Sequence, residues 1–235
     1  MKKKIVEVST SRDVSEKSSE TGTAQRSDLV VWSGGCDSTL IVCQLASKME
    51  KGKILETITV KHHQVSTEKL RMEAISRERM AIFIKAKYGV TIRQTIVCIH
   101  SNGNMSPSIG ENPQATIWLA AVIPYLTSHL NIHFGYIKDD YGRKGKADFI
   151  KTFGHMAEYR DLKDVKIVFD LERMDKKTVL KELSDLEVPD NCMWWCEYPK
   201  ADPEGYVSTD LFTSCGKCEP CVTHNGGGEV ASMLR

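Results

Sequence analysis

The residues near the start of the chain that are best suited to chemistry are Ser33-Gly34-Gly35-Cys36-Asp37-Ser38-Thr39. They follow the apolar run Leu29–Trp32 and precede a segment with helical periodicity, Leu40–Met49. This order predicts a strand, a tight glycine turn and the start of a helix. Two glycines let successive backbone N–H groups face one point without a Cβ in the way, and a helix N-terminus favours negative charge. The stretch therefore predicts an anion site, with phosphate as the expected ligand.

Side chains of the same stretch could complete a nucleotide site. Ser33 and Ser38 supply hydroxyl donors, and Asp37 supplies a carboxylate that can hold Mg²⁺ or its water ligands beside phosphates. The stretch lacks the Gly-Lys-Ser/Thr ending of a Walker A loop and the GxGxxG pattern of a dinucleotide-binding turn. The competing interpretation is a tight turn in which Asp37 or Ser38 only caps a helix.

A second group of reactive side chains lies near the other end of the chain, in Cys215-Gly-Lys-Cys218-Glu-Pro-Cys221. Two-residue gaps let a tight turn aim three thiolates at one point, and Cys196 would complete a tetrahedral zinc site. Four thiolates leave no open coordination position, so we expect a structural metal. Cys192 is the rival for the fourth position. Unmetallated thiols or an iron–sulfur cluster are the competing interpretations of the whole group.

The elements that must position these groups follow from the hydrophobic pattern. We expect strands at 29–32, 54–61, 90–100, 131–138 and 165–170. We expect helices at 40–49, at 67–87 with a left-handed end at Gly89, at 114–130 with a kink at Pro124, at 147–159, and after a cap at Asp175. Alternating strands and helices predict an α/β fold with a doubly wound, five-stranded parallel sheet. Ligands of such sheets bind at the carboxyl ends of the strands, where the glycine turn falls.

The pattern SGGxDS after a first hydrophobic strand resembles the pyrophosphatase loop, or PP-loop, of the N-type ATP pyrophosphatase superfamily. Its members have an adenine nucleotide alpha hydrolase-like fold and split ATP between the α and β phosphates to adenylate a substrate. Together with the CxxCxxC segment, the loop makes the chain similar to the 7-cyano-7-deazaguanine synthase (QueC) family over nearly all residues from Asp28 on. Met174-Asp175-Lys176 resembles the family's helix entry that carries a lysine, and Trp195-Cys196-Glu197 resembles its lone zinc cysteine.

The resemblance implies an ATP-dependent carbon–nitrogen ligase of queuosine biosynthesis. In the family, the carboxylate of 7-carboxy-7-deazaguanine attacks the α-phosphate, ammonia displaces AMP to give an amide, and a second activation yields the nitrile. The implied sites are ATP and Mg²⁺ at residues 33–39, catalytic roles for Asp37, Ser38 and Lys176, and structural zinc on the four cysteines. A homodimer is also implied. The substrate-side candidates are His62, Gln114, Asp140 and Arg143. The competing interpretation of Lys176 is a solvated lysine in the first turn of a helix.

Two segments depart from the family pattern. A Pro-Gly-Arg-Asn segment in the family is replaced by Asn112-Pro113-Gln114-Ala115, and a Ser-Gly-Tyr-Pro-Asp substrate loop is replaced by residues 140–146. Both line the substrate side of the site in the family. The chain could therefore be a divergent enzyme that passes the activated carboxylate to another amine, on a protein or nucleic-acid partner, and stops at the amide. It could also be a tRNA thiolation enzyme of the same superfamily, or a non-catalytic ATP-binding module of a larger complex.

Length and composition limit these possibilities. The chain has 235 residues, 41% hydrophobic and 27% charged, which suffices for one substantial core and a small appendage. We predict a flexible N-terminal arm at 1–27 with a short strand at Ile5–Val8, a PP-loop ATP-binding domain at 28–188, and a zinc module with tail at 189–235. The net charge of +1 demands neither nucleic acid nor membrane as a partner. Without an apolar run of membrane-spanning length or a signal peptide, we expect a cytoplasmic protein whose eight cysteines are thiols.

Overall fold

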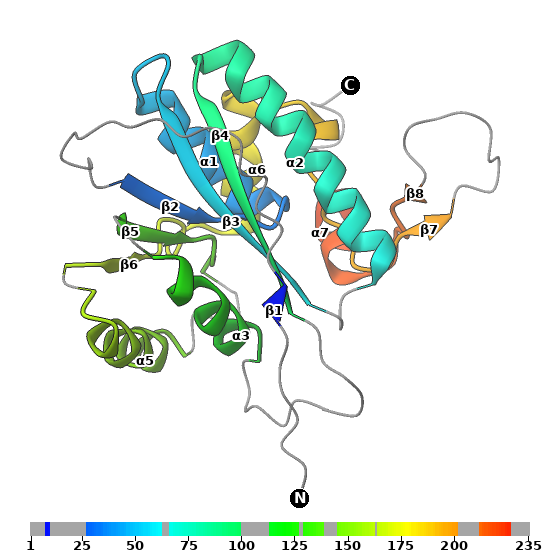
Figure 1. Ribbon diagram of the computed structural model, residues 1–235. Helices are drawn as coiled ribbons and strands as arrows, with labels where there is room; N and C mark the ends of the chain where they lie inside the picture. Colours follow the sequence, from blue (N-terminus) through cyan, green and yellow to red (C-terminus); the bar gives the residue numbers. More distant parts are fainter. Residues whose placement is uncertain are drawn as a thin grey trace, which may run out of the picture.

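The computed structural model describes residues 8–9, 27–62, 66–99, 113–126, 129–138, 145–162, 164–201 and 212–226. A twisted sheet with strand order β1-β4-β3-β2-β5-β6 runs through this part of the molecule (Figure 1). Five of its strands are β2 (Ser27–Val31), β3 (Ile54–His62), β4 (Thr91–Ile99), β5 (His129–Phe134) and β6 (Lys166–Val168). All pairs among them are parallel, which confirms the predicted five-stranded parallel sheet.

A sixth, very short strand extends the sheet beside β4. It is β1 (Val8–Ser9), which pairs with Ile99 and Cys98 in the antiparallel direction. The sequence predicts a short strand at Ile5–Val8, and residues 5–7 lie outside the described part. β2 begins at Ser27, which is the last residue of the predicted arm. The remainder of the predicted arm is likewise outside the described residues.

Helices cover both faces of the sheet, as expected for a doubly wound fold (Figure 1). One face carries α1 (Cys36–Lys48), α2 (Thr67–Tyr88) and α6 (Lys176–Asp185), and the other carries α3 (Pro113–Val122) and α5 (Lys146–Tyr159). Alternate residues of β2 pack into the two hydrophobic cores, one on each face of the sheet. Val30 packs with α1, α2 and α6, whereas Leu29 and Val31 pack with α3 and α5. Burial on both faces explains why this strand is a continuous apolar run.

Local sequence signals set most helix ends. Asp175 caps α6 by accepting a 2.8 Å hydrogen bond from the Thr178 N–H, and Gly89 ends α2 with φ +71°, as predicted. The prediction of one helix over 114–130 is wrong. The α-helix ends at Val122, and Pro124 lies in a 3₁₀ turn, η1 (Ile123–Tyr125), because proline cannot donate the next helical hydrogen bond.

The segment after α6 contains only short elements in its described part. They are η2 (Asp190–Cys192), β7 (Lys200–Ala201), β8 (Phe212–Thr213) and α7 (Glu219–Gly226). β7 and β8 form an antiparallel pair. Val188, Cys192 and Met193 pack into the same core as α1 and α2, so the segment is anchored to the sheet domain at its beginning.

Candidate nucleotide site and cysteine cluster

The glycine loop, defined here as residues 32–35, connects the carboxyl end of β2 to α1. In the sheet, β3 and β4 lie on one side of β2, whereas β5 and β6 lie on the other. The chain therefore changes direction between β2 and β5, and such a switch point is where open α/β sheets bind ligands. Gly135, just after β5, also approaches this place, since a Cβ on it would lie 2.9 Å from the Ser38 nitrogen.

Two serines hold the glycine loop in shape. The Ser33 N–H donates to Ser38 Oγ (3.2 Å), the Gly35 N–H donates to Ser33 Oγ (3.1 Å), and the two hydroxyl oxygens lie 3.1 Å apart. Gly34 has φ +101°, a conformation that favours glycine. The hydroxyls of Ser33 and Ser38 therefore accept hydrogen bonds from two of the loop's N–H groups.

Asp37 and Lys176 meet beside the loop. Asp37 is in the first turn of α1, and Lys176 is in the first turn of α6. The lysine Nζ lies 2.8 Å from Oδ1 and 2.7 Å from Oδ2 of the carboxylate, and both side chains are about three-quarters buried, with 22% and 24% exposure. The structure therefore does not support a solvated Lys176. It brings together two of the residues predicted to be catalytic, 139 positions apart in the sequence.

Two predicted loop residues turn their side chains into the core. Cys36 is 1% exposed, and burial raises the pKa of its thiol to about 11. Thr39 is fully buried, and its hydroxyl accepts a 3.1 Å hydrogen bond from the Trp32 indole. Only the backbone groups of Cys36 and Thr39 could contact a ligand in this arrangement.

The substrate-side candidates are less well defined. His62 is the last residue of β3, and Gln114 lies in the first turn of α3; nothing is described of their side chains. Asp140 and Arg143 lie outside the described residues. A cavity of about 530 Å³ lies between α5 and β6, and none of the predicted site residues lines it.

Several residues that contact the loop were missed from sequence. The Trp194 N–H donates to the Gly34 carbonyl (3.1 Å), and the Arg77 guanidinium donates to the Ser33 carbonyl. A Cβ at position 34 would lie 2.7 Å from the Glu73 carbonyl oxygen, so α2 packs directly on the loop. Nothing in the sequence distinguishes Arg77 from the other charged residues of this 22-residue helix.

A chain of charges connects α2 to the cysteine-rich segment. Lys69 lies 2.5 Å from Glu197 and 3.9 Å from Glu73, which is one turn away on α2. Burial raises the pKa of the Glu73 carboxyl to about 7, although Lys69 and Arg77 act in the opposite direction. A carboxyl that is neither fully charged nor fully neutral at physiological pH therefore lies behind the glycine loop.

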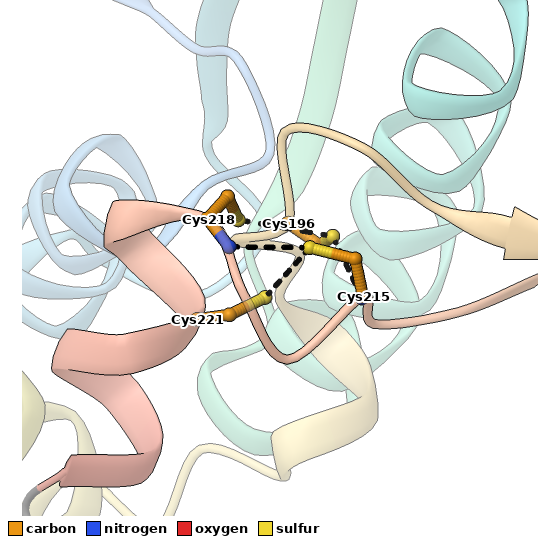
Figure 2. Close-up of side chains that lie close together, drawn as sticks. All are labelled: Cys196, Cys215, Cys218 and Cys221. Atoms are coloured by element: carbon orange, nitrogen blue, oxygen red, sulfur yellow. Dashed lines mark hydrogen bonds between the residues drawn. The ribbon is translucent and has the colours of Figure 1, made fainter.

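Four thiols form the second candidate site (Figure 2). Cys196, Cys215, Cys218 and Cys221 have their sulfur atoms all within 4.8 Å of one another. Cys221 belongs to α7, and Cys215 and Cys218 lie on the turn before it. Cys192, the rival, packs instead in the core with α1 and α2. The structure thus brings together the four cysteines predicted as ligands and could hold a metal ion there.

Backbone N–H groups converge on these sulfurs. Cys215 Sγ accepts from the Lys217 N–H (3.4 Å) and the Cys218 N–H (3.3 Å), and these bonds lower the pKa of the Cys215 thiol to about 6. Cys196 Sγ accepts from the Cys215 N–H (3.1 Å). N–H donors stabilise a thiolate, which is the form that binds metals. Burial raises the pKa of the Cys196 and Cys221 thiols, so the N–H donors favour the thiolate form at Cys215 in particular.

Trp194 and Trp195 join the cluster to the sheet domain. Both pack on the cysteines, and Trp195 also packs on the core that contains α1 and α2. The Trp194 indole donates to the Cys196 carbonyl (2.8 Å), and Trp195 stacks on His224 with ring centroids 3.7 Å apart. The two tryptophans therefore have a packing role.

A comparison with models of known protein families gives a match over the second half of the chain. The family model described as "Queuosine biosynthesis protein QueC" matches residues 116–230, just under half of the chain. The second half of the chain is similar to QueC. QueC and other PP-loop proteins are ATP-dependent enzymes, so the match supports an ATP-using enzyme. The matched range includes Lys176 and the four cysteines but not the glycine loop, so the loop and the family match are independent observations.

Comparison with solved structures and curated proteins adds less. Among the solved structures, the chain is similar to the U34-tRNA thiolase NcsA from Methanococcus maripaludis with its 4Fe-4S cluster. The two are 18% identical with a TM-score of 0.44 over 89% of this chain and 70% of that one. The comparison with curated proteins found no match. Within the described residues, no helix is long and apolar enough to cross a membrane.

Proposed function

We propose that this QueC-like chain is a cytoplasmic, ATP-dependent ligase that adenylates the carboxylate of 7-carboxy-7-deazaguanine and joins it to ammonia. The observation that carries the proposal is the glycine loop at the switch point of the sheet, with the Asp37–Lys176 pair beside it. A loop in this place suits an anionic ligand, and the pair supplies one group for a metal ion and one for a phosphate.

The reaction requires charge stabilisation more than covalent chemistry by the protein. A carboxylate oxygen of the substrate attacks the α-phosphate, the bond from the α-phosphorus to the bridging oxygen breaks, and pyrophosphate leaves. The N–H groups in the first turn of α1 stabilise the charge that develops on pyrophosphate, whereas those of Ser33 and Gly35 donate to serine hydroxyls. Lys176 lies where it could contact a phosphate oxygen, while Asp37 could orient a hydrated Mg²⁺, which would neutralise phosphate charge.

The second half of the reaction forms the carbon–nitrogen bond. The nitrogen of ammonia attacks the acyl carbon, AMP leaves, and one proton is released to give the amide. For the nitrile, the amide oxygen attacks a second ATP and pyrophosphate leaves. Loss of AMP and of both N–H protons then gives the carbon–nitrogen triple bond. Both activations use the same site, so one glycine loop suffices for the whole sequence.

Zinc is the metal that we propose for the cysteine cluster. Four thiolates bound to one zinc ion at about 2.3 Å place the sulfurs about 3.8 Å apart. The Cys215–Cys221 and Cys196–Cys218 sulfur pairs are separated by 3.9 and 4.0 Å. A cubane iron–sulfur cluster binds each thiolate to a different iron and would hold the sulfurs further apart. A four-thiolate zinc site is closed, so its contribution is to folding.

The identity of the acceptor amine has less support than the activation of the carboxylate by ATP. Residues 112–115 and 140–146 depart from the family pattern on the substrate side, which favours a second candidate. In it, the acyl-adenylate passes to an amine other than ammonia, such as one on a protein or nucleic-acid partner, and the product is an amide. We propose a homodimer for either function, by the same family resemblance.

Product analysis tests these candidates directly. Pyrophosphate release is measured with Mg-ATP in the presence and absence of 7-carboxy-7-deazaguanine, and products are identified by mass spectrometry with ammonia or with candidate amines. We expect release that depends on the carboxylate, and Asp37→Ala should abolish it. Asp185→Ala is the matched control, because Asp185 is also a helical aspartate paired with a lysine, Lys181 at 2.5 Å, on an exposed surface.

Each outcome selects one candidate. Nitrile formation with ammonia supports the leading proposal, and an amide with another amine supports the second. ATP binding without pyrophosphate release under any condition would mean a non-catalytic ATP-binding module. Activity that persists in Asp37→Ala would show that the glycine loop is not the reacting site.

A further inference from the structure

Arg77 is a deeply buried cation behind the glycine loop. It is 2% exposed, and no other lysine or arginine in the described ranges is buried. Besides donating to the Ser33 carbonyl, the guanidinium would lie 3.4 Å from a Cβ at position 34, measured from Nη1. The same Cβ would lie 3.2 Å from Arg77 Cγ, which is a tight contact, so Arg77 packs closely against Gly34.

The positive charge of Arg77 is incompletely balanced. Its Nε has no hydrogen-bond partner among the described residues. The acidic groups that act on it are Glu73 and Glu78 of the same helix, and Glu78 is exposed to solvent. Glu73 is shared with Lys69 at 3.9 Å, and its raised pKa leaves it only partly charged near neutral pH.

Burial of an unbalanced charge is unfavourable, and proteins usually pair such groups or use them in binding. Burial accordingly lowers the pKa of Arg77, although a guanidinium stays protonated in proteins. The balancing charge that is missing would be supplied by an anion on the opposite, N–H side of the loop. The triphosphate of ATP is the anion that the proposed function brings there.

We infer that Arg77 is a positioning residue for the polyphosphate of ATP. It fixes the Ser33 carbonyl on the α2 side of the loop, so that the Gly34 N–H of the same peptide group faces the opposite, ligand side, and its charge acts on the phosphates through the loop. This inference rests on the proposed nucleotide site. The opposing interpretation is a structural arginine whose only role is to join α2 to the loop.

Binding measurements on matched arginine variants separate the two interpretations. Arg77→Met removes the charge and keeps much of the apolar volume. Arg79→Met is the control, because Arg79 lies on the same helix and also donates to a backbone carbonyl, that of Asn191 at 3.3 Å. Affinities for Mg-ATP, Mg-pyrophosphate and adenosine are measured by calorimetry, and unfolding temperatures are measured with and without Mg-pyrophosphate.

We expect Arg77→Met to weaken ATP and pyrophosphate binding about 10- to 100-fold, as for the loss of a charge-assisted contact. Adenosine affinity should stay unchanged, because adenosine carries no phosphate. The ligand-free variant should unfold at the same or a higher temperature, since an unbalanced buried charge has been removed. Arg77→Lys keeps the charge and should recover part of the pyrophosphate affinity, while Arg79→Met should match the wild type.

The outcomes are distinguishable from failure of the proposed function. If the wild type binds neither ATP nor pyrophosphate, the nucleotide site itself is wrong. If the wild type binds both and Arg77→Met binds them equally well, only the role of Arg77 is overturned. An Arg77→Met protein that is unstable without ligand, with Arg77→Lys restoring stability but not pyrophosphate affinity, would support the structural interpretation instead.

Discussion

The glycine loop and the cysteine cluster are built in opposite ways. All four thiols of the cluster come from residues 196–221, and backbone N–H groups of the same segment contact them. The loop has a local sequence motif, but its contacts come from α2 and the segment before Cys196, and the adjacent Asp37 pairs with α6. Spacing within one segment indicates three ligands of such a cluster and leaves Cys192 and Cys196 as rivals for the fourth, which the structure assigns to Cys196. The sequence can locate a loop that depends on distant elements, but it does not show which distant residues contact that loop.

The two regions are nevertheless joined by four consecutive residues, 194–197. Trp194 donates its N–H to the Gly34 carbonyl, Cys196 belongs to the cluster, and Glu197 pairs with Lys69 of α2. A metal that fixes Cys196 would therefore also fix the partner of the glycine loop. In this way a closed metal site can support a nucleotide site without contacting the nucleotide. Variants of either region can break this dependence, and their expected effects differ widely in size.

Loss of the metal should have the largest effect. Cys196→Ser removes one thiolate, and we expect zinc content to fall and the free energy of unfolding to drop by more than about 4 kcal/mol, as is usual when a structural metal is lost. ATP affinity should fall with it, because the Trp194 contact depends on this segment. Metal content by elemental analysis and unfolding in denaturant provide the measurements.

Cys98→Ser is the control for that variant, since Cys98 lies in β4 and is not among the four clustered thiols. It should keep both zinc and ATP affinity. A Cys196→Ser protein that loses zinc yet binds ATP as tightly as the wild type would show that the two regions are independent.

A single methyl group in the loop should have the next largest effect. Gly34→Ala places a Cβ at 2.7 Å from the Glu73 carbonyl oxygen, in a backbone with φ +101°. We expect a loss of about 3 kcal/mol in stability, from strain and steric overlap together, and loss of ATP binding. Gly52→Ala is a matched control, because Gly52 has φ +86° but open space around it. It should lose only about 1 kcal/mol and bind ATP normally.

Features of the fold that depend on local pattern could be predicted from the sequence. The strands and helices followed from periodicity, and Asp175 and Gly89 followed from capping rules, because each signal lies within a few residues of its effect. The end of α3 was misplaced, since its apolar residues continue past Pro124 and hide the point where hydrogen bonding stops. Cys36 and Thr39 belong to the motif, yet their side chains face the core, which only the orientation of α1 determines.

Residues that act on the site from far away could not be predicted in the same manner. Lys176 was proposed only through the family resemblance, and its contact with Asp37 requires α1 and α6 to lie side by side. Arg77 and Trp194 have no local signature at all. Their roles arise from where α2 and residues 190–196 pack against the loop, which is a property of the tertiary structure.

Removal of the Asp37–Lys176 ion pair should have a smaller effect, mainly on the rate of AMP formation. Lys176→Met leaves Asp37 without this partner and removes a cation from the phosphate side, so AMP formation should fall about 10- to 100-fold. Stability should also fall, because a largely buried carboxylate loses its cation. Lys177→Met, at the exposed neighbouring position, should retain wild-type rates. Rates of AMP release under saturating ATP provide the measurement. If Lys176→Met and Lys177→Met release AMP at equal rates, the Asp37–Lys176 pair takes no part in the reaction.

The smallest predicted effect concerns the pH dependence of stability. The folded state raises the pKa of Glu73 from 4.5 to about 7, so folding favours the protonated carboxyl. Its contribution to stability is therefore fully present below about pH 4.5 and is lost as the pH rises through 7. Relative to Glu73→Gln, the wild type should lose roughly 1–3 kcal/mol of unfolding free energy between about pH 5 and 8. Urea unfolding at several pH values measures this, with Glu78→Gln as the exposed control on the same helix.

Parallel curves of unfolding free energy against pH for wild type and Glu73→Gln would mean that Glu73 ionises normally. Arg77 would then have a fully charged partner in Glu73, and its buried charge would be balanced by the protein without a bound anion.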